Sequence, residues 1–362
     1  FPTRRSSDLM IFIVKAEPPA EGISRAEAAK AMALIFEDPG NLENMAADRE
    51  ISAFTDKEKG NWFVKYMDYL YEKGYLDPKV TPATLISAQG NLTYEDTAYM
   101  MGKVSGDLEK QVGMTHWNRK KTFARNDWWD IYRAAVEKTD QEGSMKEISA
   151  ILFGTPSNME QADSWTAYTT EGNFGFQGLA LDAYLDNEIR FWVRGQEIAG
   201  MTQVIEDKPV YKNIWISDVE KDQFTVYIGK YLRTFTAEGR LVSQAEKKKD
   251  ELKSCVADLH MEKGKLKKVT VKKERVRGKV LAVTDDSIEL EGYGCVPLDD
   301  NFHVYKAYGD FQVLGKGSIL VGYDLQEFVA ADGKLSAAIL EQPLDAETIR
   351  VLIMDNGFKQ IF

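Results

Sequence analysis

The sequence is poor in the residue types that build metal centres, disulfide frameworks and nucleophilic sites. Among 362 residues it has two cysteines and three histidines. Cys255 and Cys295 show no C-x-x-C spacing, so we expect two buried free thiols, with a disulfide between them as the alternative. His116, His260 and His303 lie far apart and outside any H-E-x-x-H motif. No metal site and no cofactor are therefore predicted.

Other signals of function are also missing. The sequence has no G-x-S-x-G nucleophile motif, and no pair of catalytic carboxylates stands out from its many acidic residues. Apolar runs stay well short of the ~18 residues that a membrane-spanning helix needs. The net charge of −11, from 46 basic and 57 acidic residues, argues against nucleic acid as the general partner. We name no catalytic residue, and we expect these residues to be inactive as an enzyme.

Composition and hydrophobic periodicity divide the chain into six segments and predict an α+β multidomain protein. A helical bundle is expected first, then two small antiparallel β barrels or sandwiches, then the first strands of a further domain. The expected bounds are residues 1–9 for a translated sequencing-adapter oligonucleotide, 10–21 for a signal-peptide remnant or linker, 22–142 for the helical domain, 145–245 for a β-rich domain, 252–344 for a small β barrel, and 345–362 for the truncated start of the further domain. A signal peptide would place the protein outside the cell, at the wall or membrane.

Local helix signals are clearest in the first of these domains. Ser24 and Glu27 have the spacing of a capping box, in which each side chain satisfies a free backbone amide of the first turn. Thr93 and Asp96 repeat that spacing, and Gly74 follows an apolar helical stripe at the position of a left-handed cap. Further helices are expected from about residue 61 and over about 126–138, and the Asp-Pro-Gly sequence at 38–40 is expected to end the first helix.

Motifs within residues 22–105 resemble surface-layer homology repeats, whose helices begin at a T-R-A-E motif. The matching stretches are Ile23-Ser24-Arg25-Ala26-Glu27-Ala28-Ala29, Phe54-Thr55-Asp56, Gly74-Tyr75-Leu76 and Leu92-Thr93-Tyr94-Glu95-Asp96. The resemblance implies a helical bundle that binds a cell-wall polymer. It assigns Arg25 to the ligand motif, whereas Tyr94 stands in that position at the second helix start. A plain packing domain, in which these residues only cap helices, is the alternative.

A change of hydrophobic period from 3.6 to 2 near residue 147 predicts strands in the middle of the chain. Strands are expected at 174–181, 188–194, 197–205, 213–219, 223–228 and 231–236, with tight turns at Gly195 and Gly229. Aromatic residues on these strands are expected in cores or cross-strand pairs, and a carbohydrate-stacking platform is the alternative. They are Trp192, Tyr211, Trp215, Tyr227 and Tyr231. The charged run at 246–250 is the expected linker.

Two basic stretches oppose the acidic balance of the chain. One runs from Lys110 to Arg125, and either contacts a phosphate-rich polymer or serves as a solvated connector. In the other, residues 246–279, thirteen basic residues accompany six acidic ones. Its candidate contacts to an anionic wall polymer or membrane surface are Lys265, Lys267, Lys273, Arg275 and Arg277. Lysines on a sheet edge that prevent strand addition are the alternative.

The end of the chain carries a second resemblance. Residues 276–340, followed by Thr348-Ile349-Arg350-Val351-Leu352-Ile353, resemble the lead-in to a SpoIID/LytB domain, the family of stage II sporulation protein D and the amidase enhancer. Members of the sporulation type cleave peptidoglycan as lytic transglycosylases, with a glutamate on a helix that has no match in this sequence. The turn Asp332-Gly333 before it predicts a type I′ hairpin.

The SpoIID/LytB resemblance implies the accessory, wall-facing part of a peptidoglycan-remodelling protein of sporulation or cell division. Peptidoglycan or a secondary cell-wall polymer is then the expected partner, together with sporulation or division proteins, and no nucleic acid. A non-enzymatic wall-polymer-binding protein is the main alternative. An intracellular RNA-binding protein built on a small β barrel is a third and less favoured one.

Overall fold

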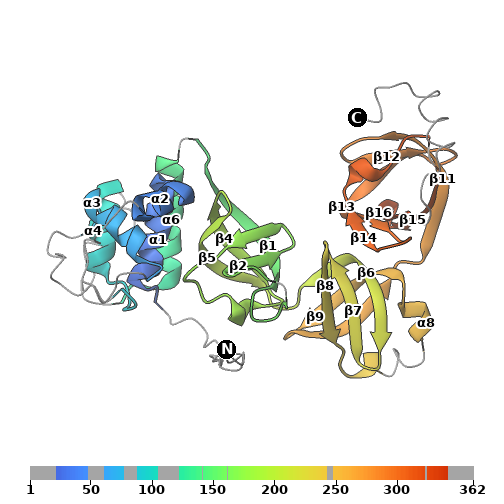
Figure 1. Cartoon of the computed structure of the whole chain (residues 1–362), viewed down its shortest axis with the longest axis horizontal. Helices are drawn as coiled ribbons and strands as arrows, with labels where there is room; N and C mark the ends of the chain where they lie inside the picture. The colour runs from blue at the N-terminus through green and yellow to red at the C-terminus, as the bar shows by residue number, and fades with distance from the viewer. Residues whose placement is uncertain are drawn as a thin grey trace, which may run out of the picture. The chain divides into compact units, whose positions relative to one another are not determined.

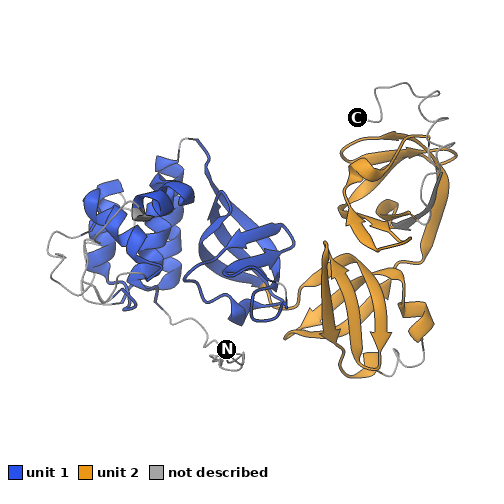
Figure 2. Cartoon of the chain, in the orientation of Figure 1, with its two compact units in different colours: residues 1–205 blue, residues 206–362 orange. Residues whose placement is uncertain are grey.

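The computed structural model describes residues 22–47, 61–76, 88–104, 122–140, 142–160, 162–242, 248–322 and 324–340. The chain divides into two compact units, residues 1–205 and 206–362 (Figure 2). The α+β class is confirmed, since helices are followed by three mainly antiparallel sheets (Figure 1). The predictions for residues 1–21, for the Phe-Thr-Asp motif at 54–56 and for 345–362 lie outside the described residues.

The first unit begins with a helical bundle in which the predicted helix starts are confirmed. Its helices are α1 (Arg25–Phe36), α2 (Pro39–Ala47), α3 (Val64–Glu72), α4 (Tyr94–Val104) and α6 (Arg125–Thr139). Ser24 and Glu27 form the predicted capping box, and Gly74 has the left-handed conformation expected after α3. The prediction that Pro39 ends a helix was incomplete. Proline also suits the first helical position, because no partner is needed for an amide there, and so α2 begins at Pro39.

Helix α1 lies at the centre of this bundle. Nine of its twelve residues are buried, so the helix is covered on all sides rather than on one stripe. One of the nine is Lys30, whose side chain is fully buried among apolar neighbours. Its ammonium group donates to the backbone oxygen of Gln177 over 2.9 Å and pairs with the Glu197 carboxylate. Glu197 lies on a strand of the sheet that follows the bundle, and Gln177 lies in a turn between strands of that sheet.

That sheet is a closed barrel of β1 (Met145–Gly154), β2 (Thr166–Thr169), β3 (Gly172–Gly175), β4 (Glu188–Arg194) and β5 (Glu197–Glu206). A parallel contact between Gly175 and Glu197 closes it. The predicted strands at 188–194 and 197–205 are confirmed. The strand predicted at 174–181 was too long, because the chain turns after β3, where the Leu179 amide donates to the Phe176 oxygen over 3.0 Å.

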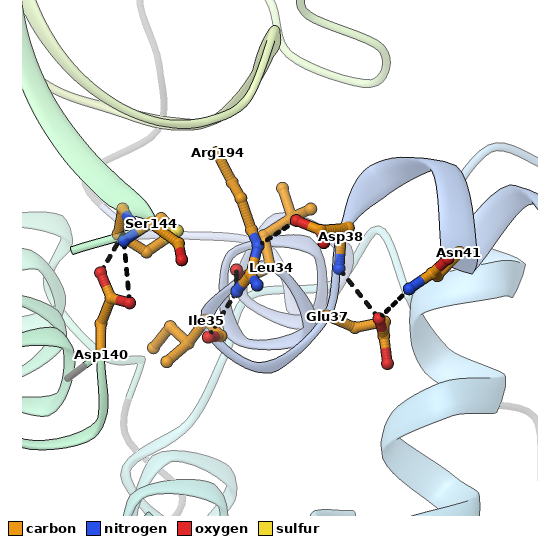
Figure 3. A network of polar contacts seen from close by, with 9 residues as sticks. Leu34, Ile35, Glu37, Asp38, Asn41, Asp140, Ser144 and Arg194 are labelled. Carbon is orange, nitrogen blue, oxygen red and sulfur yellow. Dashed lines mark hydrogen bonds and ion pairs between the residues drawn. The ribbon is translucent and has the colours of Figure 1, made fainter. Parts of the chain in front are cut away.

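The bundle and this barrel are joined by polar contacts at the ends of α1 and α6 (Figure 3). Arg194, at the end of β4, donates to the Leu34 and Ile35 carbonyls of α1 over 3.0 and 2.8 Å. These carbonyls belong to the last turn of the helix and have no partner within it. Asp140, after α6, accepts from the Ser144 amide over 3.0 Å and so fixes the chain as it enters β1.

Close backbone approaches complete this interface. A β-carbon on Gly200 of β5 would lie 2.1 Å from the Trp129 ring of α6, so only glycine leaves room for that ring. Trp192 of β4 packs edge-on against Tyr132 of α6, with ring centroids 5.9 Å apart. The helical bundle and the first barrel therefore share one packed interface, although the sequence predicted separate domains at 22–142 and 145–245.

The second unit begins with a five-stranded sheet in the order β10-β9-β6-β7-β8. Its elements are β6 (Val210–Glu220), β7 (Gln223–Ile228), β8 (Tyr231–Thr236), the short helix α8 (Lys249–Leu252), β9 (Cys255–Glu262) and β10 (Lys265–Val271). Because β9 pairs with β6, this sheet contains strands from both sides of the expected linker at 246–250. The predicted division between 145–245 and 252–344 is thus corrected: the β-rich part forms three strand assemblies, not two.

A six-stranded sheet completes the described chain. Its strands are β11 (Glu274–Val283), β12 (Ser287–Leu290), β13 (Gly294–Lys306), β14 (Gln312–Leu314), β15 (Asp324–Ala331) and β16 (Lys334–Leu340). Strand β13 pairs with β12 as well as with β16, so five of the six strands form a closed ring. Asp332 and Gly333 both have positive φ, which confirms the predicted type I′ hairpin between β15 and β16.

The two sheets of the second unit meet at Asn213, a fully buried residue of β6 with a φ of 56°. Its side-chain amide donates to the Asp299 carboxylate over 3.1 Å and to the Asn301 oxygen over 3.0 Å, both on β13. The Tyr305 hydroxyl of β13 donates to the Asn213 carbonyl. Left-handed φ is a strained conformation for most residues other than glycine, and Asn tolerates it best. Both the backbone conformation and the side-chain hydrogen bonds therefore favour asparagine at this position.

Candidate functional site

The starts of helices α1, α4 and α6 form a closed cycle in the bundle. Isolated antiparallel bridges pair Ser24 with Asn91, Thr93 with Thr122, and Ala124 with Gly22. The first residue of each pair immediately precedes a helix. The second lies three positions before the first residue of the next helix in the cycle. Each helix start is therefore in contact with both others, and the three first turns converge on one part of the surface.

Charged side chains follow the same cycle. The Arg25 guanidinium of α1 lies 2.9 Å from the Asp96 carboxylate of α4, and Arg125 of α6 lies 3.1 Å from Glu27 of α1. In each case the cation is the first residue of its helix and the acid is the third residue of another helix. Tyr94 occupies the first position of α4, and burial together with the nearby Asp127 of α6 raises its pKa.

A cleft of about 260 Å³ opens beside one of these junctions, between the bundle and the barrel. On the bundle side it is lined by Gly22, Ser24, Glu27, Gln89, Asn91 and Arg125. On the barrel side it is lined by Gly178, Leu179, Ala180, Leu181, Tyr184 and Met201. One wall thus carries an ion pair, a hydroxyl and two amides, and the other is mostly apolar.

The ion pair of this cleft is largely shielded from water. Only 16% of the Arg125 side chain and 19% of the Glu27 side chain are exposed, and the buried Arg125 Nε atom has no hydrogen-bond partner within the described residues. Burial raises the pKa of Tyr184; Arg125 opposes that shift and Glu27 adds to it, which places the phenol in the field of the ion pair. The cleft is therefore lined by both a shielded cation, Arg125, and an aromatic ring, Tyr184.

The other predicted contact residues lie elsewhere. Arg25 occupies the equivalent junction of α1 with α4, and it does not line the cleft. Lys265 and Lys267 lie on β10, the edge of the five-stranded sheet, where Lys267 pairs with Glu238 over 2.5 Å. Arg275 and Arg277 lie on β11, a strand inside the next sheet, and Lys273 lies in the connection between β10 and β11. The structure thus spreads the five residues along one stretch that crosses two sheets.

Strand β10 is the last strand in the order of its sheet, but its Leu266 is bridged to Ala237 and accepts from the Glu238 amide over 3.1 Å, so the edge is partly paired. Lys273 and Arg277 are exposed, whereas Arg275 is half-buried and donates to the Lys272 carbonyl over 2.9 Å. The carbohydrate platform suggested for the strand aromatics is wrong. Tyr211 and Trp215 are buried in the second unit, with Trp215 packed against Tyr305, and Trp192 is buried in the first.

The cysteine prediction is half right. Both thiols are free, but only Cys255 is buried, where burial raises its pKa to about 11. Cys295, on the outer part of β13, is exposed. Within the residues that the structure describes, no group of three or more His, Cys, Asp or Glu side chains is placed to hold a metal ion. Helices long and apolar enough to cross a bilayer are likewise absent from that part of the chain.

The sequence predicted the helix over about 126–138 and so located the start of α6 to within one residue, but it assigned Arg125 to the end of a basic stretch and not to a candidate site. A signal does exist: Phe123-Ala124-Arg125-Asn126-Asp127 has the same order of apolar, small, cationic, neutral and acidic residues as Ile23-Ser24-Arg25-Ala26-Glu27. The barrel residues of the cleft carry no such signal, because only tertiary packing brings Tyr184 and Met201 to the bundle. No family model matches the chain, and no curated protein matches it.

Proposed function

We propose that the first unit binds an anionic cell-wall polymer in the Arg125 cleft. In this proposal the chain is the accessory, wall-facing part of a SpoIID/LytB-type peptidoglycan-remodelling protein, located outside the cell. The observation that supports it best is the cleft itself, whose lining combines the shielded ion pair of Arg125 and Glu27 with the aromatic ring of Tyr184. The two motif resemblances, to surface-layer homology repeats and to the SpoIID/LytB lead-in, supply the biological context.

The chemistry of the cleft suits an acidic sugar. A carboxylate or phosphate substituent would accept from Arg125, because guanidinium groups match such anions in geometry. Sugar hydroxyls would exchange hydrogen bonds with Ser24, Asn91 and Gln89, and the apolar face of the ring would lie on Tyr184. The volume of about 260 Å³ is below the about 300–1,000 Å³ of pockets for drug-sized ligands, which favours one sugar residue of a polymer.

Sedimentation with purified cell walls tests this proposal. The Arg125→Ala variant should bind walls about tenfold or more weakly, the loss that 1.4 kcal/mol of contact energy produces. Arg133→Ala is the matched control: it removes an arginine from the same helix, one that is 42% exposed and pairs with Glu147 away from the cleft. Equal binding by these two variants would remove the cleft from consideration.

The same sedimentation experiment also tests Arg25→Ala and substitutions in the basic stretch of the second unit. If Arg25 or the pair Lys273 and Arg277 controls wall binding while Arg125 does not, the polymer site lies at those residues instead. Walls stripped of their anionic polymers should bind the unchanged protein poorly, and neutral peptidoglycan alone should not compete. Strong weakening by salt is expected, because the contact is an ion pair.

A non-enzymatic wall-binding protein remains the second candidate, since the same cleft would serve it. Extension of the gene beyond residue 362 distinguishes the two: a helix carrying a catalytic glutamate supports the remodelling enzyme, and its absence over the following domain supports the binding protein. In either case we expect residues 1–362 to release no glycan fragments from purified peptidoglycan.

A further inference from the structure

Trp165 stands apart from the other large apolar residues of the first barrel. It lies in the connection between β1 and β2, and 49% of its surface is exposed. The other large hydrophobic residues exposed in the described part of the first unit are Val204 and Ile205, near the end of β5. About half of this tryptophan is open to water, more than its contact with the barrel core requires, so its presence on the turn needs a further explanation.

The backbone makes this tryptophan more unusual. The Thr166 amide donates to the Asp163 oxygen over 3.2 Å, which makes residues 163–166 a β-turn with Trp165 at its third position. Its φ is 57°, in the left-handed region where turns normally place glycine or asparagine. A bulky aromatic residue is strained in this conformation, and strain of this kind concentrates at functional sites.

Neighbouring groups hold the strained residue in one orientation. The Phe176 amide donates to the Trp165 carbonyl over 2.8 Å. The Phe176 ring, itself buried, meets the indole edge-on at a centroid distance of 5.7 Å and an angle of 68°. The indole is therefore held against Phe176 while about half of the residue, 49%, stays open to water, and we take this as a preorganised stacking surface.

We propose that Trp165 is a sugar-stacking residue that binds a neutral pyranose ring of a glycan. Its open surface is a single aromatic ring, far smaller than the roughly 800 Å² per partner of a stable protein interface. The residues before it in the turn, Asp163 and Ser164, are exposed and polar. A pyranose matches this arrangement, because its axial C–H groups form an apolar face and its hydroxyls form a polar rim. This contact is independent of the Arg125 cleft, since it uses no cation.

Titration with a tetramer of N-acetylglucosamine tests the proposal, with the indole N–H resonances of the whole chain as the readout. The Trp165 resonance is identified by its loss in the Trp165→Phe variant. It should shift in a saturable manner with millimolar tetramer. Trp165→Phe should keep most of the affinity, because the phenyl ring still stacks. Trp165→Gly should lose about tenfold or more.

The glycine variant separates a ligand role from a structural one. Glycine is relaxed at positive φ, so the unfolding midpoint should stay within about 4 °C of the unchanged protein while binding is lost. Trp165→Asn also suits this backbone and replaces the glycine variant if that variant unfolds. The Arg125→Ala variant should bind the tetramer normally, whatever its affinity for anionic polymer.

Three results would overturn the proposal. One is a Trp165 resonance that does not move at about 10 mM tetramer, a concentration at which even weak stacking registers. The second is unchanged tetramer affinity in Trp165→Gly. The third is tetramer binding that depends on Arg125, which would place the sugar in the cleft. The first two results leave the binding of anionic polymer by Arg125 untouched, so failure of this proposal can be told apart from failure of the cleft proposal.

Discussion

The Arg125 guanidinium lies 3.1 Å from the Glu27 carboxylate, so two residues 98 positions apart in sequence join the first turns of two helices. The same carboxylate accepts from the Ser24 amide over 3.0 Å and completes the capping box of α1. Glu27 therefore makes two interactions: a local one that caps α1 and a long-range one that pairs with Arg125. Because Arg125 also lines the cleft, the residue that orients the proposed ligand contact is Glu27.

Substitutions at Glu27 should separate these two tasks. Glu27→Gln keeps a group that can accept from the Ser24 amide but removes the charge beside Arg125, and we expect a loss of about 0.5–1.5 kcal/mol in unfolding free energy. Glu27→Ala removes both contacts and should cost about 1–3 kcal/mol. Urea denaturation measures the difference. Equal losses for the two variants would show that only the ion pair matters.

The buried ion pair between Lys30 and Glu197 should respond asymmetrically to substitution. Glu197→Gln leaves a charged lysine buried without its counter-charge, and we expect a loss of about 3–5 kcal/mol. Lys30→Met replaces the lysine by an apolar side chain of similar length and leaves Glu197 partly open to water. That variant should be neutral or more stable by about 1–4 kcal/mol. Thermal unfolding checks the order, and a large destabilisation by Lys30→Met would contradict it.

The same lysine should produce a pH dependence of stability. Burial lowers the pKa of Lys30 from 10.5 to about 8, although Glu197 opposes the shift. Between pH 8 and 10.5 the unfolded chain therefore binds more protons at this residue than the folded chain, so its contribution to stability increases as the pH rises. Below pH 8 the cost of the buried ammonium is fully present. The stability difference between Lys30→Met and the unchanged protein should shrink over that window in denaturation at fixed pH values, and a constant difference would contradict this assignment.

Glycine at position 200 should be irreplaceable for reasons of space alone. Its φ is not in the left-handed region, yet an added β-carbon would lie 2.1 Å from the Trp129 ring. We expect Gly200→Ala to cost about 1–3 kcal/mol, because the bundle and barrel would have to move apart. Gly102→Ala in α4 is the matched control: no atom lies within 4 Å of its added carbon, and it should gain about 0.5–1 kcal/mol. Chemical denaturation of both variants tests the contrast.

Asn213 should be the most sensitive polar residue of the second unit. Asn213→Ala removes both side-chain hydrogen bonds to β13 and places a β-carbon at positive φ, so we expect a loss of about 2–4 kcal/mol. Asn213→Gly loses the same hydrogen bonds but relaxes the backbone, and it should be about 1 kcal/mol more stable than the alanine variant. Unfolding by guanidinium is the measurement. A glycine variant no better than alanine would show that φ is not under strain.

Local chemistry made part of this fold predictable. The capping boxes at Ser24 and Thr93, the left-handed Gly74 and the hairpin at Asp332 all rest on residues a few positions apart, so the sequence indicates them directly. Arg125 escaped because its helix has Ala124 in the capping position, and alanine offers no side-chain oxygen to the first turn. The helix itself was predicted over about 126–138, but without that signal Arg125 was assigned to the basic stretch before it.

Strand partners were the part that could not be predicted. Strand β9 pairs with β6 across a charged run that resembles a linker, and nothing local to either segment specifies this pairing. The same limit applies to Trp192, whose partner Tyr132 lies 60 positions earlier on a helix. The cleft combines a predictable part and an unpredictable one. Its bundle wall follows from local helix motifs, whereas its barrel wall depends on tertiary packing.

The cycle of three helix starts also constrains the order in which a growing chain can fold. A ribosome releases residues 22–24 and 91–93 before 122–124, so only the Ser24–Asn91 bridge can form before α6 has been made. The ion pair of Glu27 can form only after Arg125 has been synthesised. The ion pair of Lys30 can form only later, after residue 197 on β5 has been added. A nascent chain therefore carries its central helix without its final partners until more than half of the sequence has been synthesised.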